Sequence, residues 1–409
     1  MSSYTFLLVA LLLGTAHAGS SRWEPVRQAL DAFWPIKDMA FTAGDVTGRK
    51  FTYEKGATNM TSPLFMASAS KFPAAIAIVG VVADGHVSFD TRVYEVFPWW
   101  TSDPHDKRSR VTLRHLLSFT SGFYSPDAGG ELPCLRVGST NYTWEDCAKE
   151  IFHDAPFEFE PGSTWCYNSF HLQVAGAMAA KAANISLQQL LQVYLIDKLR
   201  LTATSWIGGE NPLLAASMST TGEDYDRILR AYVSYEVVPK QLANEMERDY
   251  LEGSVQIANS SGFLTRLLGH YSMCNYFECF FPKLQDFTPR CKKANVHMDA
   301  GLFGYYPLVD RASGTYMQIV RMKIVKSLND FQPTISALTL RLLIKHKVDQ
   351  ALAPQGDATK SAINAAAASE KDHIWDAARE VLSRAGMGDL YNSPADLWPD
   401  DTDESSVVI

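Results

Sequence analysis

Residues 64–71 read Leu-Phe-Met-Ala-Ser-Ala-Ser-Lys, and an apolar run rich in Ala, Ile and Val follows as far as Ala83. Asp84-Gly85 ends this run, which predicts a buried helix with Ser68 at its start. Lys71 stands three positions after Ser68, so on a helix the two side chains share one face. A serine hydroxyl becomes a nucleophile when a base takes its proton, and a buried lysine can be that base because desolvation disfavours its charged form. The stretch therefore predicts an activated serine.

The sequence on both sides of this helix predicts a sheet. Residues 39–53 alternate apolar and polar around a turn, which indicates a hairpin. Residues 301–308 and 314–325 indicate a second hairpin, and residues 334–348 an amphipathic helix that could cover the sheet. We therefore expect an α+β fold, an antiparallel sheet flanked by helices plus a mostly helical lobe. The helices of that lobe are expected at 111–123, 170–183, 187–199 and 222–235.

The composition argues against several classes of partner. The formal net charge is −8 and no block rich in Lys or Arg occurs, so neither nucleic acid nor an acidic membrane surface is expected. The longest apolar stretch after the N-terminus, Phe72–Ala83, is shorter than the roughly 20 residues that a membrane-spanning helix needs. We expect no membrane span in the mature chain.

The N-terminus has the features of a secretory signal peptide. The short apolar run Phe6–Leu13 precedes Ala16-His17-Ala18, a small-x-small cleavage pattern. We predict a signal peptide at 1–18, one main domain at 19–351, and an appendage at 352–409 that is partly helical with an acidic, disordered end. The protein is therefore expected to be secreted, with N-glycans possible at four sequons, Asn59, Asn141, Asn184 and Asn259.

Cysteine usage agrees with an oxidising compartment. An even number of cysteines favours disulfides over free thiols there. Cys134 with Cys147 could close one loop and two of the later three another, but spacing alone does not assign partners among the fifteen possible pairings. No CxxC spacing supports zinc, and we expect neither a metal nor a cofactor. The six positions are Cys134, Cys147, Cys166, Cys274, Cys279 and Cys291.

Further segments stand in a fixed order behind the Ser68 stretch. Gly-His-Val-Ser-Phe-Asp occurs at 85–90, and Thr-Leu-Arg-His-Leu-Leu-Ser-Phe-Thr-Ser-Gly at 112–122. Later segments are Pro-Gly-Ser-Thr-Trp-Cys-Tyr at 161–167, Ser-Thr-Thr-Gly-Glu-Asp-Tyr at 219–225, and Gly-Leu-Phe-Gly at 301–304 running to Val309-Asp310. Together these segments resemble the class C β-lactamase and penicillin-binding-protein-like serine hydrolase family, over about residues 41–351.

The resemblance implies a site between the sheet and the helical lobe, where Ser68 forms an acyl-enzyme and Lys71 is the general base. Tyr167 matches the tyrosine of the family's Y-x-N motif, whose phenol hydrogen-bonds the nucleophile and passes protons to the leaving group. The oxyanion hole in this family uses backbone amides of the nucleophile and of a residue just after the strand motif. Here these would be Ser68 and Leu302, beside Gly301.

Two positions depart from the family pattern. Ser169 stands where the asparagine of Y-x-N is expected, which could move a substrate contact onto Asn168. The family's K-T-G or H-x-G strand motif aligns with Asp299-Ala300-Gly301, and His297, on the same face of a strand, could take that place instead. A buried Asp299 could pair with Lys71 and keep it charged, whereas a solvated one would repel anionic substrates.

A carboxylate at the strand motif disfavours the free carboxylate of a β-lactam or a D-alanyl peptide. We therefore expect a secreted serine hydrolase that acts through an acyl-enzyme on an ester, amide or uncharged substrate, a small molecule or a peptide, whose identity the sequence does not give. One alternative is a catalytically silent relative that keeps the fold as a binding or scaffold protein, and another is a D,D-carboxypeptidase or β-lactamase. An active enzyme needs Ser68, Lys71 and Tyr167 within hydrogen-bond reach of one another.

Overall fold

The computed structural model describes most of the chain between Arg22 and Pro354. The described residues are 22–126, 132–139, 141–258, 269–278, 289–326, 330–354 and Ser383. The predicted signal peptide, the sequon at Asn259, Cys279 and nearly all of the predicted appendage lie outside them. Within the described part, no helix is both long and apolar enough to cross a membrane.

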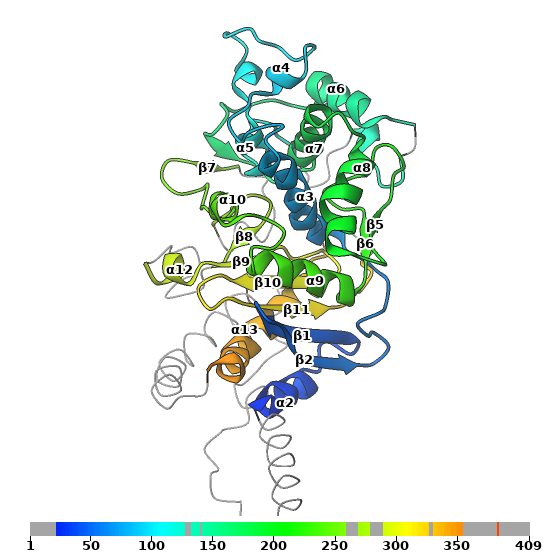
Figure 1. Ribbon diagram of the computed structural model, residues 1–409, viewed down its shortest axis with the longest axis vertical. Helices are drawn as coiled ribbons and strands as arrows, with labels where there is room; N and C mark the ends of the chain where they lie inside the picture. The colour runs from blue at the N-terminus through cyan, green and yellow to red at the C-terminus, as the bar shows by residue number, and fades with distance from the viewer. Residues whose placement is uncertain are drawn as a thin grey trace, which may run out of the picture.

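A six-stranded antiparallel sheet joins the two ends of the described chain (Figure 1). Its β1 strand pairs with β2 in the predicted hairpin and with β11 from the C-terminal hairpin, from Ala40 opposite Val320 to Asp45 opposite Thr315. At the bulge beside Gly44, a Cβ would lie 2.6 Å from the Gly48 carbonyl oxygen, so glycine is needed there. In spatial order the strands are β2 (Gly48–Lys55), β1 (Met39–Asp45), β11 (Thr315–Val320), β10 (Tyr306–Asp310), β9 (Val296–Met298) and β8 (Tyr276–Phe277).

Helices cover both faces of this sheet. On one side α9 (Gly222–Val233) packs on β1, β10 and β11, and on the other α13 (Gln332–Leu352) packs on β1 and β10 together with α2 (Glu24–Ala32) (Figure 1). The antiparallel sheet, these covering helices and the mostly helical lobe above them confirm the predicted α+β fold class.

The lobe consists of short helices gathered around α3. Its helices are α3 (Lys71–Ala83), α4 (Val93–Val96), α5 (Leu113–Leu117), α6 (Trp144–Asp154), α7 (Phe170–Ala182), α8 (Leu187–Leu191) and α10 (Lys240–Met246), with α12 (Pro289–Ala294) beside the sheet. Short strands complete the fold: β3 (Leu64–Phe65), β5 (Ser205–Trp206) and β6 (Met218–Thr220) in one sheet, and β4 (Thr164–Trp165) with β7 (Gln256–Ile257) in another.

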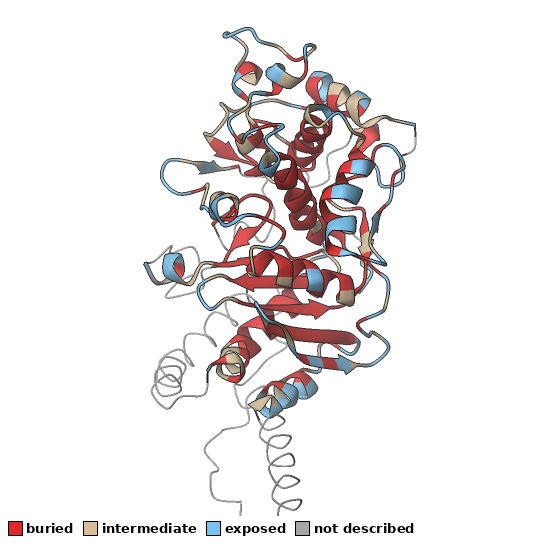
Figure 2. Ribbon diagram, viewed as in Figure 1, coloured by how far each residue is buried: buried red, intermediate tan, exposed pale blue. Residues whose placement is uncertain are grey.

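The central helix α3 is buried from Lys71 to Val81, as the red ribbon in Figure 2 shows. It packs against α7, α8 and a π-helical turn at Gln192–Asp197. That turn replaces the end of the helix predicted at 187–199 and places Tyr194 against Gly80, where a Cβ would lie 2.6 Å from the ring. Pro73 lies in the first turn of α3, where its missing N–H costs no helical hydrogen bond.

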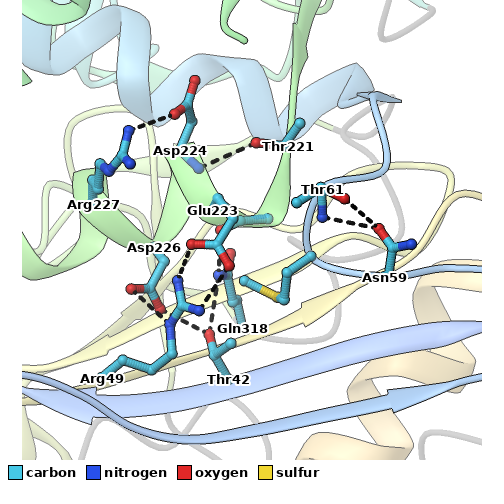
Figure 3. A network of polar contacts seen from close by, with 12 residues as sticks. Thr42, Arg49, Asn59, Thr61, Thr221, Glu223, Asp224, Asp226, Arg227 and Gln318 are labelled. Carbon is cyan, nitrogen blue, oxygen red and sulfur yellow. Dashed lines mark hydrogen bonds and ion pairs between the residues drawn. The ribbon is translucent and has the colours of Figure 1, made fainter. Parts of the chain in front are cut away.

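A polar network fastens α9 to the sheet (Figure 3). The Arg49 guanidinium of β2 donates to both carboxylate oxygens of Glu223, at 2.8 and 2.6 Å, and its Nε lies 3.2 Å from Asp226. Burial raises the pKa of Asp226, and Arg49 and the Thr42 hydroxyl, 2.9 Å away, oppose this shift. The hydroxyl of Tyr225, which precedes Asp226 in α9, donates to the Ala69 carbonyl at 2.9 Å. Helix α9 therefore also supports the start of α3.

The cysteines are partly paired. A disulfide joins Cys134 and Cys147, the loop closure that the sequence allowed without assigning it, and Cys291 is also disulfide-bonded. Cys274 has a free thiol, contrary to the general expectation of disulfides. It is fully buried, and its sulfur lies 3.4 Å from the Leu117 carbonyl, which accepts its S–H.

Candidate active site

A tight turn between β3 and α3 presents Ser68. The turn is a 3-10 helix over Ala67–Ser70, and Ala67 takes a left-handed conformation with φ 48°. A non-glycine residue in this region is strained and persists only where the surroundings hold it. Here the Ser70 hydroxyl donates to the Ala67 carbonyl at 2.6 Å and accepts from the Met218 amide at 3.1 Å. Ser68 is thereby held at the head of α3, half-buried.

Two side chains converge on the Ser68 hydroxyl oxygen. The Lys71 Nζ lies 3.0 Å from it, and the Tyr167 hydroxyl 2.9 Å from it. Lys71 also donates to the Ala215 carbonyl at 2.8 Å and lies 4.8 Å from the centre of the Tyr167 ring. The structure therefore brings the three predicted catalytic residues within hydrogen-bond distance.

The surroundings of this trio favour proton transfer. Burial lowers the pKa of the Lys71 ammonium below its usual range, and the Asp299 carboxylate and Cys274 offset part of that shift. Burial is also the main reason that the pKa of the Tyr167 phenol is raised well above its usual value. Lys71 is thus easier to deprotonate than a surface lysine, while Tyr167 keeps its proton near neutral pH.

Asp299 lies one residue past the end of β9 and contacts the backbone at the start of α3. The residue is 1% exposed, and its Oδ2 accepts from the Phe72 amide at 2.9 Å, while its Oδ1 is buried with no hydrogen-bond partner. Burial raises the pKa of this carboxyl, and Lys71 and the Phe72 amide oppose the shift. Of the two arrangements that the sequence left open, the structure shows the buried one, but without an ion pair to Lys71 within 4.0 Å.

His297 is engaged elsewhere in the sheet. Its Nδ1 lies 2.8 Å from the Asn275 side-chain oxygen and its Nε2 lies 2.9 Å from that of Asn295. Burial lowers the pKa of the imidazole to about 4, so it is neutral at neutral pH. Both ring nitrogens already have partners, and the structure gives His297 no hydrogen bond to Ser68, Lys71 or Tyr167.

The backbone is tightly packed at Gly301 and Leu302, the segment predicted to contribute an oxyanion donor. A Cβ on Gly301 would lie 2.3 Å from the Met66 carbonyl oxygen, so only glycine lets this segment approach the nucleophile turn. The Gly301 amide donates to the Tyr305 carbonyl at 2.9 Å, which leaves Leu302 as the next available donor. Within the described chain, the Leu302 and Ser68 amides donate no backbone hydrogen bond.

The two residues after Tyr167 hold the start of α7. Asn168 is fully buried, its Nδ2 donates to the Phe123 carbonyl at 3.2 Å, and its Oδ1 accepts from the Phe170 amide at 3.1 Å. Ser169 is buried at the helix N-cap. The expectation that Asn168 contacts the substrate is therefore wrong, because both polar atoms of its buried side chain are bonded within the protein.

Sequence reasoning missed several groups that shape the site. The Ala215 carbonyl is the second partner of Lys71, yet a backbone acceptor 144 residues away leaves no signal in the sequence. Ser70 lies inside the quoted Ser68 stretch, and Tyr225 ends the segment quoted at 219–225. Both could have been identified as supports for the nucleophile turn.

Comparison with known proteins identifies the family and the fold. The Beta-lactamase family model matches residues 37–241, about half of the chain. A putative beta-lactamase from Bacteroides dorei is 23% identical to this chain, with a TM-score of 0.60. The alignment covers 73% of this chain and 90% of the Bacteroides protein. The hydrolase EstCE1, described as having promiscuous acyltransferase activity, is 15% identical with a TM-score of 0.59, covering 78% and 98%. A D-stereospecific amidohydrolase from Streptomyces is 18% identical with a TM-score of 0.53, covering 70% and 89%. No curated protein matches the chain.

Proposed function

This chain belongs to the beta-lactamase family, and from that premise we propose that it is a serine hydrolase that forms an acyl-enzyme on Ser68. The observation that carries the proposal is the convergence of Lys71 Nζ and the Tyr167 hydroxyl on the Ser68 oxygen, at 3.0 and 2.9 Å. A nucleophile hydrogen-bonded to both a base and a proton donor is what acyl transfer requires.

Each step can be assigned to a side chain already in place. Neutral Lys71 takes the proton of Ser68 as the serine oxygen attacks the substrate carbonyl. The Ser68 and Leu302 amides donate hydrogen bonds to the carbonyl oxygen and stabilise the negative charge that forms on it. Tyr167 then protonates the leaving group and is reprotonated by the Lys71 ammonium. A water molecule releases the acyl group by the same steps in reverse.

The substrate class that we propose is an uncharged ester or amide. The buried Asp299 carboxylate stands where the family usually places a lysine or histidine, so the position lacks a cation to hold a substrate carboxylate. The structural neighbours include an amidohydrolase and a hydrolase with acyltransferase activity, which is consistent with either ester or amide chemistry.

A catalytically silent relative is the other candidate, and one observation favours it: Asp299 disfavours deprotonation of Lys71. The geometry weighs against it, because an active enzyme needs Ser68, Lys71 and Tyr167 within hydrogen-bond reach, and here they are in contact with Ser68 only half-buried. A protein that no longer catalyses has no need to keep a strained Ala67 beside the serine.

Labelling with a fluorophosphonate probe, followed by mass mapping, tests the proposal. We expect label on Ser68 of the wild-type protein, lost in Ser68→Ala and in Lys71→Ala. Ser102→Ala, at an exposed serine, is the matched control and should label like the wild type. Absence of label in a protein shown to be folded by circular dichroism would favour the silent relative, and hydrolysis of a chromogenic cephalosporin would instead indicate a β-lactamase.

We also propose that the protein is secreted. The Cys134–Cys147 disulfide supports an oxidising compartment. Asn59, Asn141 and Asn184 are all exposed, and the Asn59 side-chain oxygen accepts from the Thr61 hydroxyl of its own sequon at 2.9 Å (Figure 3). Expression in a eukaryotic cell, with glycosidase treatment of the medium, tests this: the protein should appear there and lose mass, and retention inside the cell without glycan would contradict it.

A further inference from the structure

Asp299 connects two parts of the site with a single carboxylate. It follows β9 directly, and its Oδ2 accepts the amide of Phe72, the second residue of α3. Amides in the first turn of a helix lack helical acceptors, and an anion is stabilised at this positive end of the helix dipole. The contact therefore attaches the head of the nucleophile helix to the sheet.

The same carboxylate has a second oxygen that the protein leaves unused. Its Oδ1 is buried without a hydrogen-bond partner, an arrangement that destabilises the folded protein. An asparagine could make the bond to Phe72 without placing a negative charge inside the protein. Tethering alone therefore does not explain why an acid is present.

Among the described residues around Asp299, Lys71 is the one side chain available as a cation. Lys71 on α3 is charged only when it holds its extra proton, whereas Tyr225 on α9, and Tyr271 and Cys274 before β8, stay neutral because burial raises their pKa values. Tyr167 before α7 is likewise neutral, and His297 on β9 is neutral because burial lowers its pKa. No ion pair within 4.0 Å joins Lys71 to Asp299, so the ammonium keeps its contact with Ser68.

We propose that Asp299 is a positioning residue that serves as the counter-charge of Lys71, ready to stabilise the ammonium that forms when Lys71 takes the proton of Ser68. The inference rests on the proposed function. The step moves one proton from the Ser68 oxygen to Lys71 Nζ while the serine oxygen bonds to the carbonyl carbon. It takes place at a pH above the raised pKa of Asp299, so that Asp299 is an anion throughout. A carboxylate in direct contact would hold Lys71 permanently charged, whereas this indirect one lets it lose and regain its proton.

Two substitutions separate the charge from the tether. Asp299→Asn keeps an acceptor for the Phe72 amide and removes the charge, whereas Asp299→Ala removes both. Asp90→Asn removes an equal charge from a carboxylate whose side chain is 74% exposed and serves as the matched control. The rate of fluorophosphonate labelling of Ser68 is followed against pH in all three. Lysine Cε resonances in protein made with ¹³C-labelled lysine, with Lys71 assigned through Lys71→Arg, report its titration without any catalysis.

For Asp299→Asn we expect the pKa of Lys71 to fall by roughly one to three units, because an opposite charge nearby no longer favours its protonated form. The pH at which labelling reaches half its maximum should fall by the same amount, and the maximal labelling rate should fall as well. Asp90→Asn should match the wild type in both. An Asp299→Asn protein with the wild-type Lys71 titration and labelling profile would overturn the proposal and leave Asp299 as a tether alone.

A measurement on the unaltered protein covers the case in which Asp299→Asn does not fold. Aspartate labelled with ¹³C at the carboxyl carbon reports whether Asp299 is ionised over the pH range in which Lys71 titrates. We expect it to be ionised, and a carboxyl that stays protonated through that range would overturn the proposal. If the wild type takes no label at any pH while Lys71 still responds to Asp299, then the counter-charge stands and the proposed hydrolase function fails.

Discussion

Two buried lysines in this protein have pKa values that are shifted in opposite directions. Lys345 on α13 contacts Asp310 at 2.8 Å and Asp349 at 2.6 Å, and these carboxylates outweigh burial, so its pKa is raised. Lys71 on α3 is as deeply buried, but its hydrogen bonds go to a hydroxyl and a carbonyl, so burial dominates and its pKa is lowered. Direct carboxylate contact fixes a lysine as a permanent cation, and its absence leaves the amine free to exchange a proton.

The largest expected effect is on chemistry at Lys71. Lys71→Met should reduce the rate of Ser68 labelling about 10²–10⁴-fold, the usual contribution of a general base. Lys345→Met should leave that rate within a few-fold of wild type at a temperature where both proteins are folded. Equal losses in the two variants would show that Lys71 acts through folding and would remove the contrast between the two lysines.

The second effect, on stability, should fall on Lys345. Lys345→Met removes the cation that contacts both the buried Asp310 and the partly exposed Asp349, and we expect the free energy of unfolding to drop by about 3 kcal/mol, the low end for a broken buried pair. Urea unfolding measures this. Lys181→Met is the matched control, because that lysine is exposed and its contact with Glu145, at 3.2 Å, is a surface pair worth at most about 1 kcal/mol. A loss at Lys345 no larger than at Lys181 would contradict the assignment of a structural ion pair.

A smaller loss of activity is expected at Tyr167. Tyr167→Phe keeps the ring beside Lys71 and removes only the hydroxyl that contacts Ser68. We expect turnover of an ester substrate to fall about 10²-fold, the lower end of general-acid contributions, with the Lys71 titration little changed. Turnover equal to wild type would exclude Tyr167 from proton transfer.

The smallest effect is on how the free energy of unfolding depends on pH, because the pKa values of the two lysines shift in opposite directions. The folded pKa of Lys71 lies below its unfolded value, so between the two values the unfolded chain binds more protons and stability rises with pH. The folded pKa of Lys345 lies above its unfolded value, so its contribution is complete below about pH 10 and is lost as pH rises through the folded value. From pH 7 to 10, the unfolding free energy of wild type relative to Lys71→Met should therefore rise, by no more than about 1.4 kcal/mol per pH unit. The difference from Lys345→Met should stay constant, and a flat difference for both variants would contradict the opposite shifts.

Much of the fold could be predicted from local patterns. The apolar run after Ser68, the hairpin at 39–53 and the C-terminal hairpin appear near the expected positions, because alternation and helical spacing reflect burial directly. The π-helical turn at Gln192–Asp197 was not predictable, since it depends on how Tyr194 fits against Gly80 of another helix.

The site was predictable only in part. Spacing placed Lys71 beside Ser68, and the quoted motif supplied Tyr167. Whether Asp299 faced water or the interior was left open, because a strand pattern does not extend past Met298, where β9 ends. The hydrogen-bond partners of His297 and Asn168 come from distant segments of the chain. Only the folded structure could therefore show that both side chains are already bonded within the protein.

The account depends most on an acyl group becoming bound to Ser68. The direct test is to mix the wild-type protein with p-nitrophenyl acetate, quench it in acid within milliseconds to seconds, and measure intact and peptide masses. An acetyl adduct on the peptide containing Ser68, transient in the wild type and absent from Ser68→Ala, is the predicted result. Turnover of the ester with no adduct on Ser68, or equal turnover by Ser68→Ala, would contradict the account.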